Sequence, residues 1–219
     1  MKVNRIAVVT ESGNGLGKTF ANILLKNKYD VILAASKKSY ELLSREADVL
    51  QGYKLIKTDF TSKESLLELK RYISSNFKHL DLLINNAEIA NGFGQKIDQI
   101  EIEDVREVFE TNVFAVIRII KTLKPLLEKS DSPSIINITS ALGDINKMQD
   151  ENFCYSNYCM TAYATSKAAL NMYTHLQCKE FKPSKITINS FDPIALKNCT
   201  HNSVMICDGI KDEFISLIK

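Results

Sequence analysis

The chain has 219 residues, of which 45% are hydrophobic and 25% charged, and its formal net charge is +2. This composition is typical of a globular α/β protein, so we expect one domain over residues 1–219. The near balance of basic and acidic residues argues against a nucleic-acid partner. No apolar run reaches the roughly 20 residues of a membrane span, so we expect no membrane partner either.

The cysteines and histidines give no sign of a metal site. The five cysteines lack the spacing of a metal-ligand set or a redox pair, and the three histidines are scattered without acidic partners at ligand spacing. We therefore expect no metal ion, reduced thiols and a cytoplasmic protein.

Apolar runs alternate with amphipathic stretches along the whole chain. Strands are predicted over Arg5–Thr10, Val31–Ala35, Lys54–Asp59, Leu80–Asn85, Ser134–Ile138 and Lys185–Phe191. Helices are predicted over Leu16–Lys26, Ser39–Arg45, Lys63–Phe77, Ile102–Lys129, Thr161–Phe181 and 209–219. Several strands are apolar at successive positions, as strands covered on both faces require. The alternation therefore predicts a doubly wound parallel sheet of the Rossmann type.

The stretch TESGNGLG, residues 10–17, joins the first predicted strand to the first helix. A glycine-rich turn at a helix N-terminus can hold a pyrophosphate on backbone N–H groups, and Gly15 and Gly17 are spaced for this. Glu11 stands where such turns place their first glycine. Its charge repels phosphate unless its side chain points into solvent, and glutamate adopts positive φ only at a cost. We interpret the turn as a modified cofactor site in which Gly13 supplies the lost flexibility.

Four polar residues lie where chemistry is expected. Tyr163 and Lys167 are spaced i and i+4, so one face of a helix presents both, and an ammonium near a phenol is expected to lower the phenol's pKa toward neutrality. Ser140 follows a strand, at the sheet edge where ligands of such folds bind. Asn112 lies in a long helical run, where two readings stay open: it faces solvent, or it interrupts the helix to hold a water.

These motifs, in this order, resemble the short-chain dehydrogenase/reductase family over nearly the whole chain. The quoted stretches are TESGNGLG (10–17), Asp59, NNA (85–87), TNVF (111–114), INITS (136–140), YATSK (163–167) and the Pro193 loop. The stretches LDLLINNA, KPLLEK and IINITS are most similar to the sniffer, C-factor and carbonyl reductase branch.

The resemblance implies roles for the site residues. Tyr163 would donate the proton and Ser140 would hold the substrate carbonyl oxygen. Lys167 would bind the nicotinamide ribose and tune Tyr163, while Asn112 would support a proton-relaying water. The residues implied to contact the cofactor are Thr10, Ser12, Gly13, Gly15, Leu16, Gly17, Ser36, Lys37, Asp59, Phe60, Asn86, Ala87, Tyr163, Lys167, Pro193 and Ile194.

The chain departs from the family pattern at four positions. Glu11 and Glu88 replace glycines of the turn and of the NNAG motif, and Ile194 replaces the glycine after Pro193. Asn198 stands where a threonine often contacts the cofactor amide. The three lost glycines border the cofactor cleft, so these departures bear on cofactor affinity.

Cofactor choice depends on the end of the second predicted strand. An acidic residue there would accept from the adenosine ribose and favour NAD, but the sequence continues with Ser36, Lys37 and Lys38. A hydroxyl and ammonium groups suit a 2′-phosphate, so NADP is predicted over NAD. Two lysines that open a helix are also compatible with plain solvated surface.

The sequence thus predicts an NAD(P)H-dependent oxidoreductase that reduces a carbonyl, or oxidises the alcohol, of a small apolar substrate. Two rivals stay open: a non-catalytic binding or regulatory protein that keeps the fold, and a degenerate subunit of a hetero-oligomer. The segment NFCYSNYCM, residues 152–160, is read either as a substrate-pocket wall or as surface packing.

The resemblance also implies the sheet edge and the assembly. The family's usual last strand is missing, so we expect six strands with residues 185–191 at an exposed edge. A homodimer or homotetramer is expected through the helices at 102–129 and 161–181. The apolar residues assigned to that contact are Val113, Ile117, Ile120, Leu170 and Met172.

Overall fold

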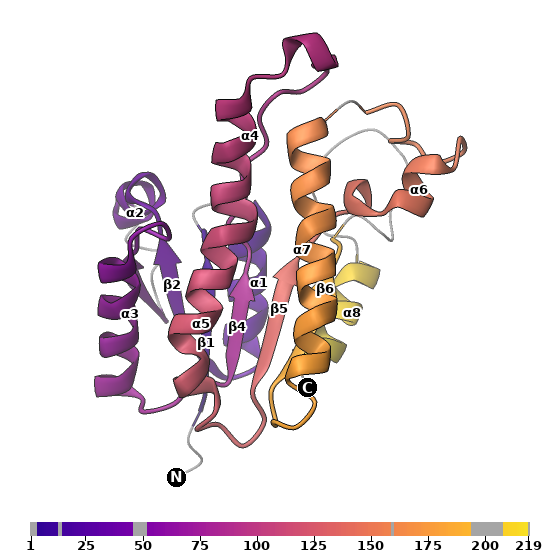
Figure 1. The fold of residues 1–219 in the computed structure, drawn as a ribbon. Coiled ribbons are helices and arrows are strands. Elements are labelled where there is room, and N and C mark those ends of the chain that lie inside the picture. The colour runs from indigo at the N-terminus through magenta and orange to yellow at the C-terminus, as the bar shows by residue number, and fades with distance from the viewer. Residues whose placement is uncertain (1–3, 13–14, 46–51, 159, 194–207, 219) are drawn as a thin grey trace.

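The computed structural model describes residues 4–12, 15–45, 52–158, 160–193 and 208–218. In this part of the chain one sheet of six parallel strands runs in the order β3-β2-β1-β4-β5-β6 (Figure 1). The strands are β1 (Arg5–Thr10), β2 (Tyr29–Ala35), β3 (Tyr53–Lys57), β4 (Leu82–Asn85), β5 (Ser134–Ile138) and β6 (Thr187–Phe191). The doubly wound Rossmann-type fold and the six-stranded sheet expected from the sequence are confirmed.

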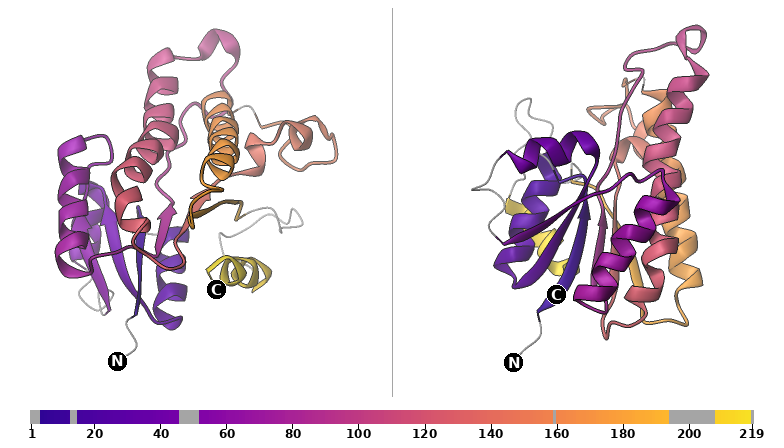
Figure 2. Two further views of the ribbon diagram at one scale, coloured as in Figure 1. Left: turned by 60° about the horizontal axis from the view of Figure 1, so that its bottom comes forward. Right: turned by 90° about the vertical axis from the view of Figure 1, so that its left-hand side faces the viewer.

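Helices cover both faces of the sheet, as the edge-on view of Figure 2 shows. They are α1 (Gly15–Lys26), α2 (Lys37–Ser44), α3 (Lys63–Asn76), α4 (Ile102–Phe109), α5 (Ala115–Leu127), α6 (Ile145–Gln149), α7 (Thr161–Glu180) and α8 (Asp208–Ile218). A π-helical segment, Glu110–Phe114, joins α4 to α5. Helices α3, α5 and α7 lie on one face, and α1, α2 and α8 lie on the other.

The strand sequences explain the two cores. Within β1, Ile6 and Val8 face the α3–α5–α7 side, while Ala7 and Val9 face the α1–α8 side, because successive side chains of a strand alternate. All four are buried. A strand covered on both faces has no polar side, which is why the apolar run predicts it.

The bounds of the predicted elements agree with the structure to within two residues, apart from two differences. The long helix expected over Ile102–Lys129 is broken by the π-helical segment, and α6 was not predicted. Strand β6 forms one edge of the sheet, as expected.

Helix α8 closes one layer of the fold. The Phe214 ring lies 4.5 Å from the Phe20 ring centroid and 5.8 Å from that of Phe191. The Tyr29 hydroxyl and the Arg5 guanidinium both donate to the Ile218 carbonyl oxygen, at 2.8 and 2.9 Å. The helix predicted at the end of the sequence is therefore docked on α1 and β6.

Two expectations about side chains are wrong in part. Val113, Ile120 and Leu170, assigned to a surface contact, are buried inside the protomer, whereas Met172 is 60% exposed. Ile120 and Leu170 are buried because they belong to the core between the sheet and helices α3, α5 and α7. Cys154 is disulfide-bonded, contrary to the expectation of reduced thiols.

Within the described ranges, no helix has the length and apolar character needed to cross a bilayer. The same ranges contain no group of three or more His, Cys, Asp or Glu side chains placed to hold a metal ion.

Candidate active site

The predicted site residues gather at the carboxyl edge of the sheet. Thr10 Oγ1 accepts the backbone N–H groups of Asn86 and Ala87, both at 2.9 Å. The Asn86 amide donates to the carbonyl oxygens of Thr10 and Glu11, at 3.1 and 2.8 Å. These bonds join the ends of β1 and β4 and so bring Thr10, Asn86 and Ala87 together.

Two glycines let α1 begin close to this edge. A Cβ on Gly17 would lie 2.6 Å from the Glu11 carbonyl oxygen and 2.8 Å from Asn86 Nδ2, so only glycine allows this packing. Gly15 has a φ of +59°, and a Cβ there would meet nothing within 4 Å. Open space therefore lies at the N-terminus of α1, where backbone N–H groups attract an anion. Gly13 lies outside the described residues.

The two other residues implied in this turn have different surroundings. Ser12 is buried, and its hydroxyl donates to the Val9 carbonyl oxygen at 3.2 Å. This bond closes the turn from within. Leu16, at the start of α1, lines a cavity described below.

Glu11 has an orientation that the sequence did not predict. Its backbone is left-handed, with a φ of 52°, and its N–H donates to the Ala34 carbonyl oxygen at 2.9 Å. The carboxylate accepts the Ser36 N–H at 2.9 Å and the Ser39 hydroxyl at 2.5 Å. It therefore points neither toward a pyrophosphate nor into solvent, but caps the N-terminus of α2. These bonds offset the roughly 1 kcal/mol or more that a left-handed non-glycine backbone costs.

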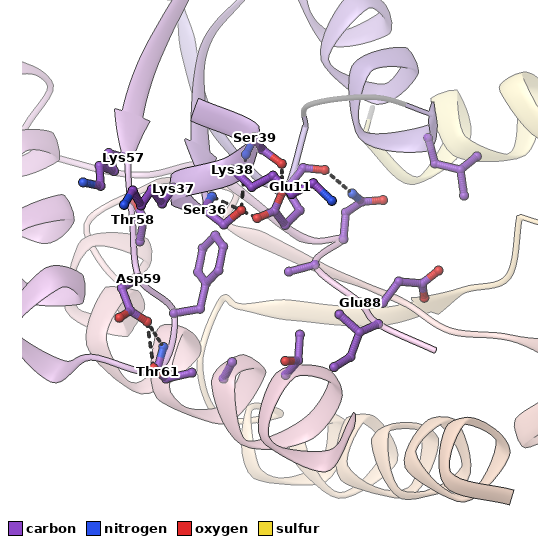
Figure 3. Close-up of a pocket in the computed structure, with 17 residues that line it drawn as sticks. Glu11, Ser36, Lys37, Lys38, Ser39, Lys57, Thr58, Asp59, Thr61 and Glu88 are labelled. Carbon is purple, nitrogen blue, oxygen red and sulfur yellow. Dashed lines mark hydrogen bonds between the residues drawn. The ribbon is translucent and has the colours of Figure 1, made fainter. Parts of the chain in front are cut away.

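A cavity of about 850 Å³ opens beside this cap. Figure 3 shows Lys37, Lys57 and Thr58 along one side, and Glu11 turned toward Ser36 and Ser39. The cavity lies between α2, the end of β3 and the loop after β4, as expected of an adenosine site at a topological switch point. Its lining includes Leu16, Ser36, Lys37, Asp59, Phe60, Asn86 and Ala87, all predicted, and also Lys38, Lys57, Thr61, Glu88 and Ile89.

Asp59 lies on the wall of this cavity. Its Oδ1 accepts both the N–H and the hydroxyl of Thr61, at 2.9 and 2.7 Å. These hydrogen bonds, the side-chain one foremost, hold the pKa of Asp59 below its ordinary value. The carboxylate is therefore ionised and oriented beside Phe60, which is buried.

Asn112 interrupts its helix, as one reading of the sequence expected, and sits in the π-helical segment. Its side chain is fully buried. The amide accepts the Ile89 N–H and donates to the Ile89 carbonyl oxygen, both at 2.9 Å, and also donates to the Ser166 hydroxyl at 3.0 Å. The amide thus fastens the loop after β4 to α7, and the reading of a solvent-facing residue is wrong.

Ser140, Tyr163 and Lys167 meet above the end of β5. The Ser140 hydroxyl lies beside the Tyr163 phenol, where it acts to lower the phenol's pKa, and both side chains are buried. Lys167 donates to the Ile138 carbonyl oxygen at 2.9 Å, and its Nζ lies 5.4 Å from the Tyr163 ring centroid. Only 1% of Lys167 is exposed. The i and i+4 spacing therefore places both groups at one point.

Glu88 is the residue of this centre that the sequence reasoning noticed but did not place there. Its Oε2 forms an ion pair with Lys167 Nζ and accepts the Tyr163 hydroxyl at 3.2 Å. The loss of the NNAG glycine was the available signal, and it was read only as a change in cofactor affinity. Asp192, with Lys147 Nζ 4.0 Å from its Oδ2, is a second carboxylate that acts on Tyr163.

The expectation that Lys167 lowers the pKa of Tyr163 is wrong. Burial raises the pKa of the phenol, and the Glu88 carboxylate raises it further, whereas the Ser140 hydroxyl opposes this. The ammonium that would stabilise a phenolate is already paired with Glu88. Tyr163 is therefore held in its protonated form at neutral pH.

Aromatic side chains cluster between the loop after β4 and the segment that joins α6 to α7. Rings of Phe153, Tyr155, Tyr158 and Phe93 contact one another in series, at centroid distances of 5.6, 5.0 and 5.4 Å. Phe93 is 68% exposed. These rings are partly open, so both readings of residues 152–160 keep support.

The Pro193 loop is described only at its start. Pro193 is buried, whereas Ile194 and Asn198 lie outside the described residues.

Comparison with known proteins gives the family. The profile described as short chain dehydrogenase matches residues 5–204. The chain belongs to the short-chain dehydrogenase family. The family resemblance drawn from the sequence is thereby confirmed, and an oxidoreductase follows at the level of the family.

Individual relatives are similar over most of the chain. An uncharacterized oxidoreductase of Staphylococcus aureus (strain MW2) is 28% identical over 193 residues, which cover 87% of this chain and 77% of the relative. The NADPH-bound carbonyl reductase from chicken fatty liver has a TM-score of 0.74 and 26% identity, covering 88% of this chain and 80% of that one. The RhlG/NADP complex of Pseudomonas aeruginosa has a TM-score of 0.73 and 27% identity, covering 88% and 73%.

Proposed function

We propose that this protein is an NAD(P)H-dependent oxidoreductase that reduces the carbonyl of a small apolar substrate or oxidises the corresponding alcohol. The observation that carries the proposal is the meeting of Tyr163, Ser140 and Lys167 at the carboxyl edge of the sheet. A cavity of cofactor-binding size opens at the same edge. One domain, residues 1–219, would carry both parts.

The residues at this edge fit a dinucleotide. Gly15 and Gly17 leave backbone space at the N-terminus of α1 for a pyrophosphate. Asp59 and Phe60 would border the adenine, and Lys167 would hold the nicotinamide ribose. The cofactor, when bound, supplies or accepts the hydride.

The protein's own residues would handle the proton and the substrate. Tyr163 is held protonated, so it is poised to donate its phenolic proton to a carbonyl oxygen that becomes an alkoxide. Ser140 would donate a hydrogen bond to that same oxygen and so orient it beside the phenol. Asn112 would fix the loop after β4 through its two hydrogen bonds to the Ile89 backbone. We also propose that Asn112 supports a proton-relaying water.

NADP is proposed as the preferred cofactor, with NAD as the alternative. Lys37, Lys38 and Lys57 line the cavity, and the N-terminus of α2 already holds one anion, the carboxylate of Glu11. A 2′-phosphate would pair with these ammonium groups, although the Glu11 carboxylate occupies the Ser36 and Ser39 donors and would oppose it. The NADPH-bound and NADP-bound structures that this chain resembles favour the same choice.

The branch of the family to which the chain belongs is also a proposal. We propose the carbonyl reductase branch, with sniffer and C-factor proteins, and a cytoplasmic location. An apolar substrate is proposed because the aromatic series from Phe93 to Phe153 offers partly open apolar surface.

A homodimer or homotetramer would form through α4, α5 and α7. Phe114, in the π-helical segment between α4 and α5, is 46% exposed, and Met172 and Leu176 on α7 are 60 and 52% exposed. In symmetric oligomers, exposed apolar residues of this kind are commonly buried against the same surface of a second copy. Light scattering should give at least twice the 24.7 kDa of one chain, and a monomer at micromolar concentration would contradict this.

The proposed function is tested by supplying a panel of aldehydes and ketones with NADPH or NADH. Loss of the reduced-nicotinamide absorbance is expected with at least one carbonyl. Cofactor binding measured by calorimetry, with no turnover of any carbonyl or alcohol, would instead support a non-catalytic binding protein. The carboxylates of Glu11 and Glu88, which line the cavity, motivate that second candidate.

A further inference from the structure

Glu88 is placed in the catalytic centre by its backbone. The segment that carries it is held on both sides: Ala87 N–H donates to Thr10, and both backbone groups of Ile89 are bonded to Asn112. The root of the Glu88 side chain is therefore set by the ends of β1 and β4 and by the π-helical segment. A small residue at this position would leave Lys167 and Tyr163 without this partner.

Lys167 has few ways to balance its charge. It is almost wholly buried, and its recorded partners are the Ile138 carbonyl oxygen and Glu88. A buried ammonium is stable only when it is paired and hydrogen-bonded. Glu88 supplies that pairing, and the Glu88 side chain itself is about a third exposed. Its carboxylate can thus turn toward water, whereas the ammonium cannot.

The Tyr163 phenol shares the same carboxylate. The charged and polar groups that face it are Glu88, Lys167, Ser140 and Asp192, with Lys147 beside Asp192. Two carboxylates act on the phenol, and one ammonium lies within reach of both Glu88 and the ring. The charge around the transferable proton of Tyr163 therefore depends on whether the Glu88 carboxylate faces the Tyr163–Lys167 pair or turns toward water.

We propose that Glu88 is a positioning residue of the Tyr163–Lys167 pair that competes with the cofactor for the Lys167 ammonium and favours the protonated phenol. This rests on the proposed function. While Glu88 is paired with Lys167, the ammonium can donate only a weaker hydrogen bond to a ribose hydroxyl. Cofactor binding must therefore move the Glu88 carboxylate away. The same contact disfavours the phenolate, so it opposes alcohol oxidation, the direction in which Tyr163 must accept a proton.

The test compares Glu88→Gln with the wild type. Glutamine keeps the size and an acceptor oxygen but removes the charge, so Lys167 is released at little steric cost. Calorimetry without substrate should show NADPH and NADH binding about 3–10-fold more tightly to the variant, since an ion pair no longer competes. The pH profile of alcohol oxidation should shift to lower pH, because the phenol ionises more easily beside a neutral amide.

A matched control is Glu107→Gln, an exposed carboxylate on α4 whose recorded partner is Asn91. It makes the same change in net charge away from the pair and should leave binding and pH profile unchanged. Glu88→Gly, which also removes the side chain, should tighten binding at least as much as Glu88→Gln. Thermal unfolding of each variant shows that it is folded.

The outcomes separate the two claims. If neither the wild type nor Glu88→Gln binds NADPH or NADH, the proposed function fails. If both bind with equal affinity and share one pH profile, only the role of Glu88 fails. Weaker binding by Glu88→Gln would also overturn the proposal, because it would mean that the carboxylate holds the cofactor and does not compete with it.

Discussion

Two glutamates that line the cavity, Glu11 and Glu88, stand where the family has glycine, and their carboxylates have different surroundings. At one end of the cavity Glu11 replaces a glycine and its carboxylate caps α2, next to exposed Lys37 and Lys38. At the other end Glu88 replaces a glycine and its carboxylate pairs with a lysine that is almost wholly buried. Each carboxylate thus occupies the donors that a dinucleotide would need.

The surroundings decide how much each carboxylate matters. Charges near the surface interact through a high effective dielectric and are screened by salt, so Glu11 should act weakly and in a salt-dependent manner. The ammonium of Lys167 is shielded from water, so its ion pair with Glu88 should act strongly and depend little on salt. The comparison predicts large effects at the catalytic end and small ones at the adenosine end.

Lys167→Ala should have the largest effect among the variants that test this comparison. It removes the ammonium and leaves the Glu88 carboxylate facing Tyr163 alone, so turnover should fall by about 100-fold or more and cofactor binding should weaken. The variant should also be less stable, because it removes the buried Lys167 side chain and its hydrogen bond to the Ile138 carbonyl oxygen.

The double variant Lys167→Ala/Glu88→Gln sharpens that result. Glu88→Gln should lower the thermal stability when Lys167 is present, because the buried ammonium then loses its anion, and should change it little in the Lys167→Ala background. The double variant should regain no turnover. An equal effect of Glu88→Gln on stability with and without Lys167 would show that the ion pair contributes nothing, and the strong end of the comparison would be lost.

Lys37→Glu should have an intermediate effect confined to one cofactor. A carboxylate in place of the ammonium should weaken NADPH about 10-fold and NADH much less, because only NADPH carries the 2′-phosphate. The matched control is Lys54→Glu, because Lys54 lies near the start of β3, at the end of the strand away from the cavity. Equal losses for the two cofactors, or a wild type that prefers NADH, would contradict the proposed preference for NADP.

Glu11→Gln should have the smallest effect. The amide keeps an acceptor for Ser36 and Ser39 but no longer opposes a 2′-phosphate, so NADPH should bind about 2–5-fold more tightly at low salt and NADH should be unchanged. The gain should disappear in high salt. Weaker NADPH binding by this variant would show that the carboxylate organises the site for the cofactor.

The sequence predicted the fold well because apolar runs alternate with amphipathic stretches, and several strands, β1 among them, are apolar on both faces. It also predicted which residues meet at the carboxyl edge, since parallel strands bring Thr10, Asn86 and Ser140 to one side. The helix break at Asn112 was predicted as one of two readings, from the poor helix propensity of asparagine.

What the sequence could not predict was where two long side chains point. Glu11 and Glu88 were both read as lost glycines, and their partners lie 25 or more residues away in the chain. Pairings of this kind depend on rotamers and on loop geometry, which periodicity does not record. The raised pKa of Tyr163 follows from one of them, so the expected effect of Lys167 on the phenol was wrong.

The most direct measurement compares binding and turnover in Tyr163→Phe. Phenylalanine keeps the ring in place and removes only the hydroxyl. We predict that the variant binds NADPH within about threefold of the wild type and loses turnover of the best carbonyl by about 10²–10⁴-fold, the usual contribution of a general acid. A variant that keeps more than half of the wild-type turnover would contradict the account, because Tyr163 would then have no part in the chemistry.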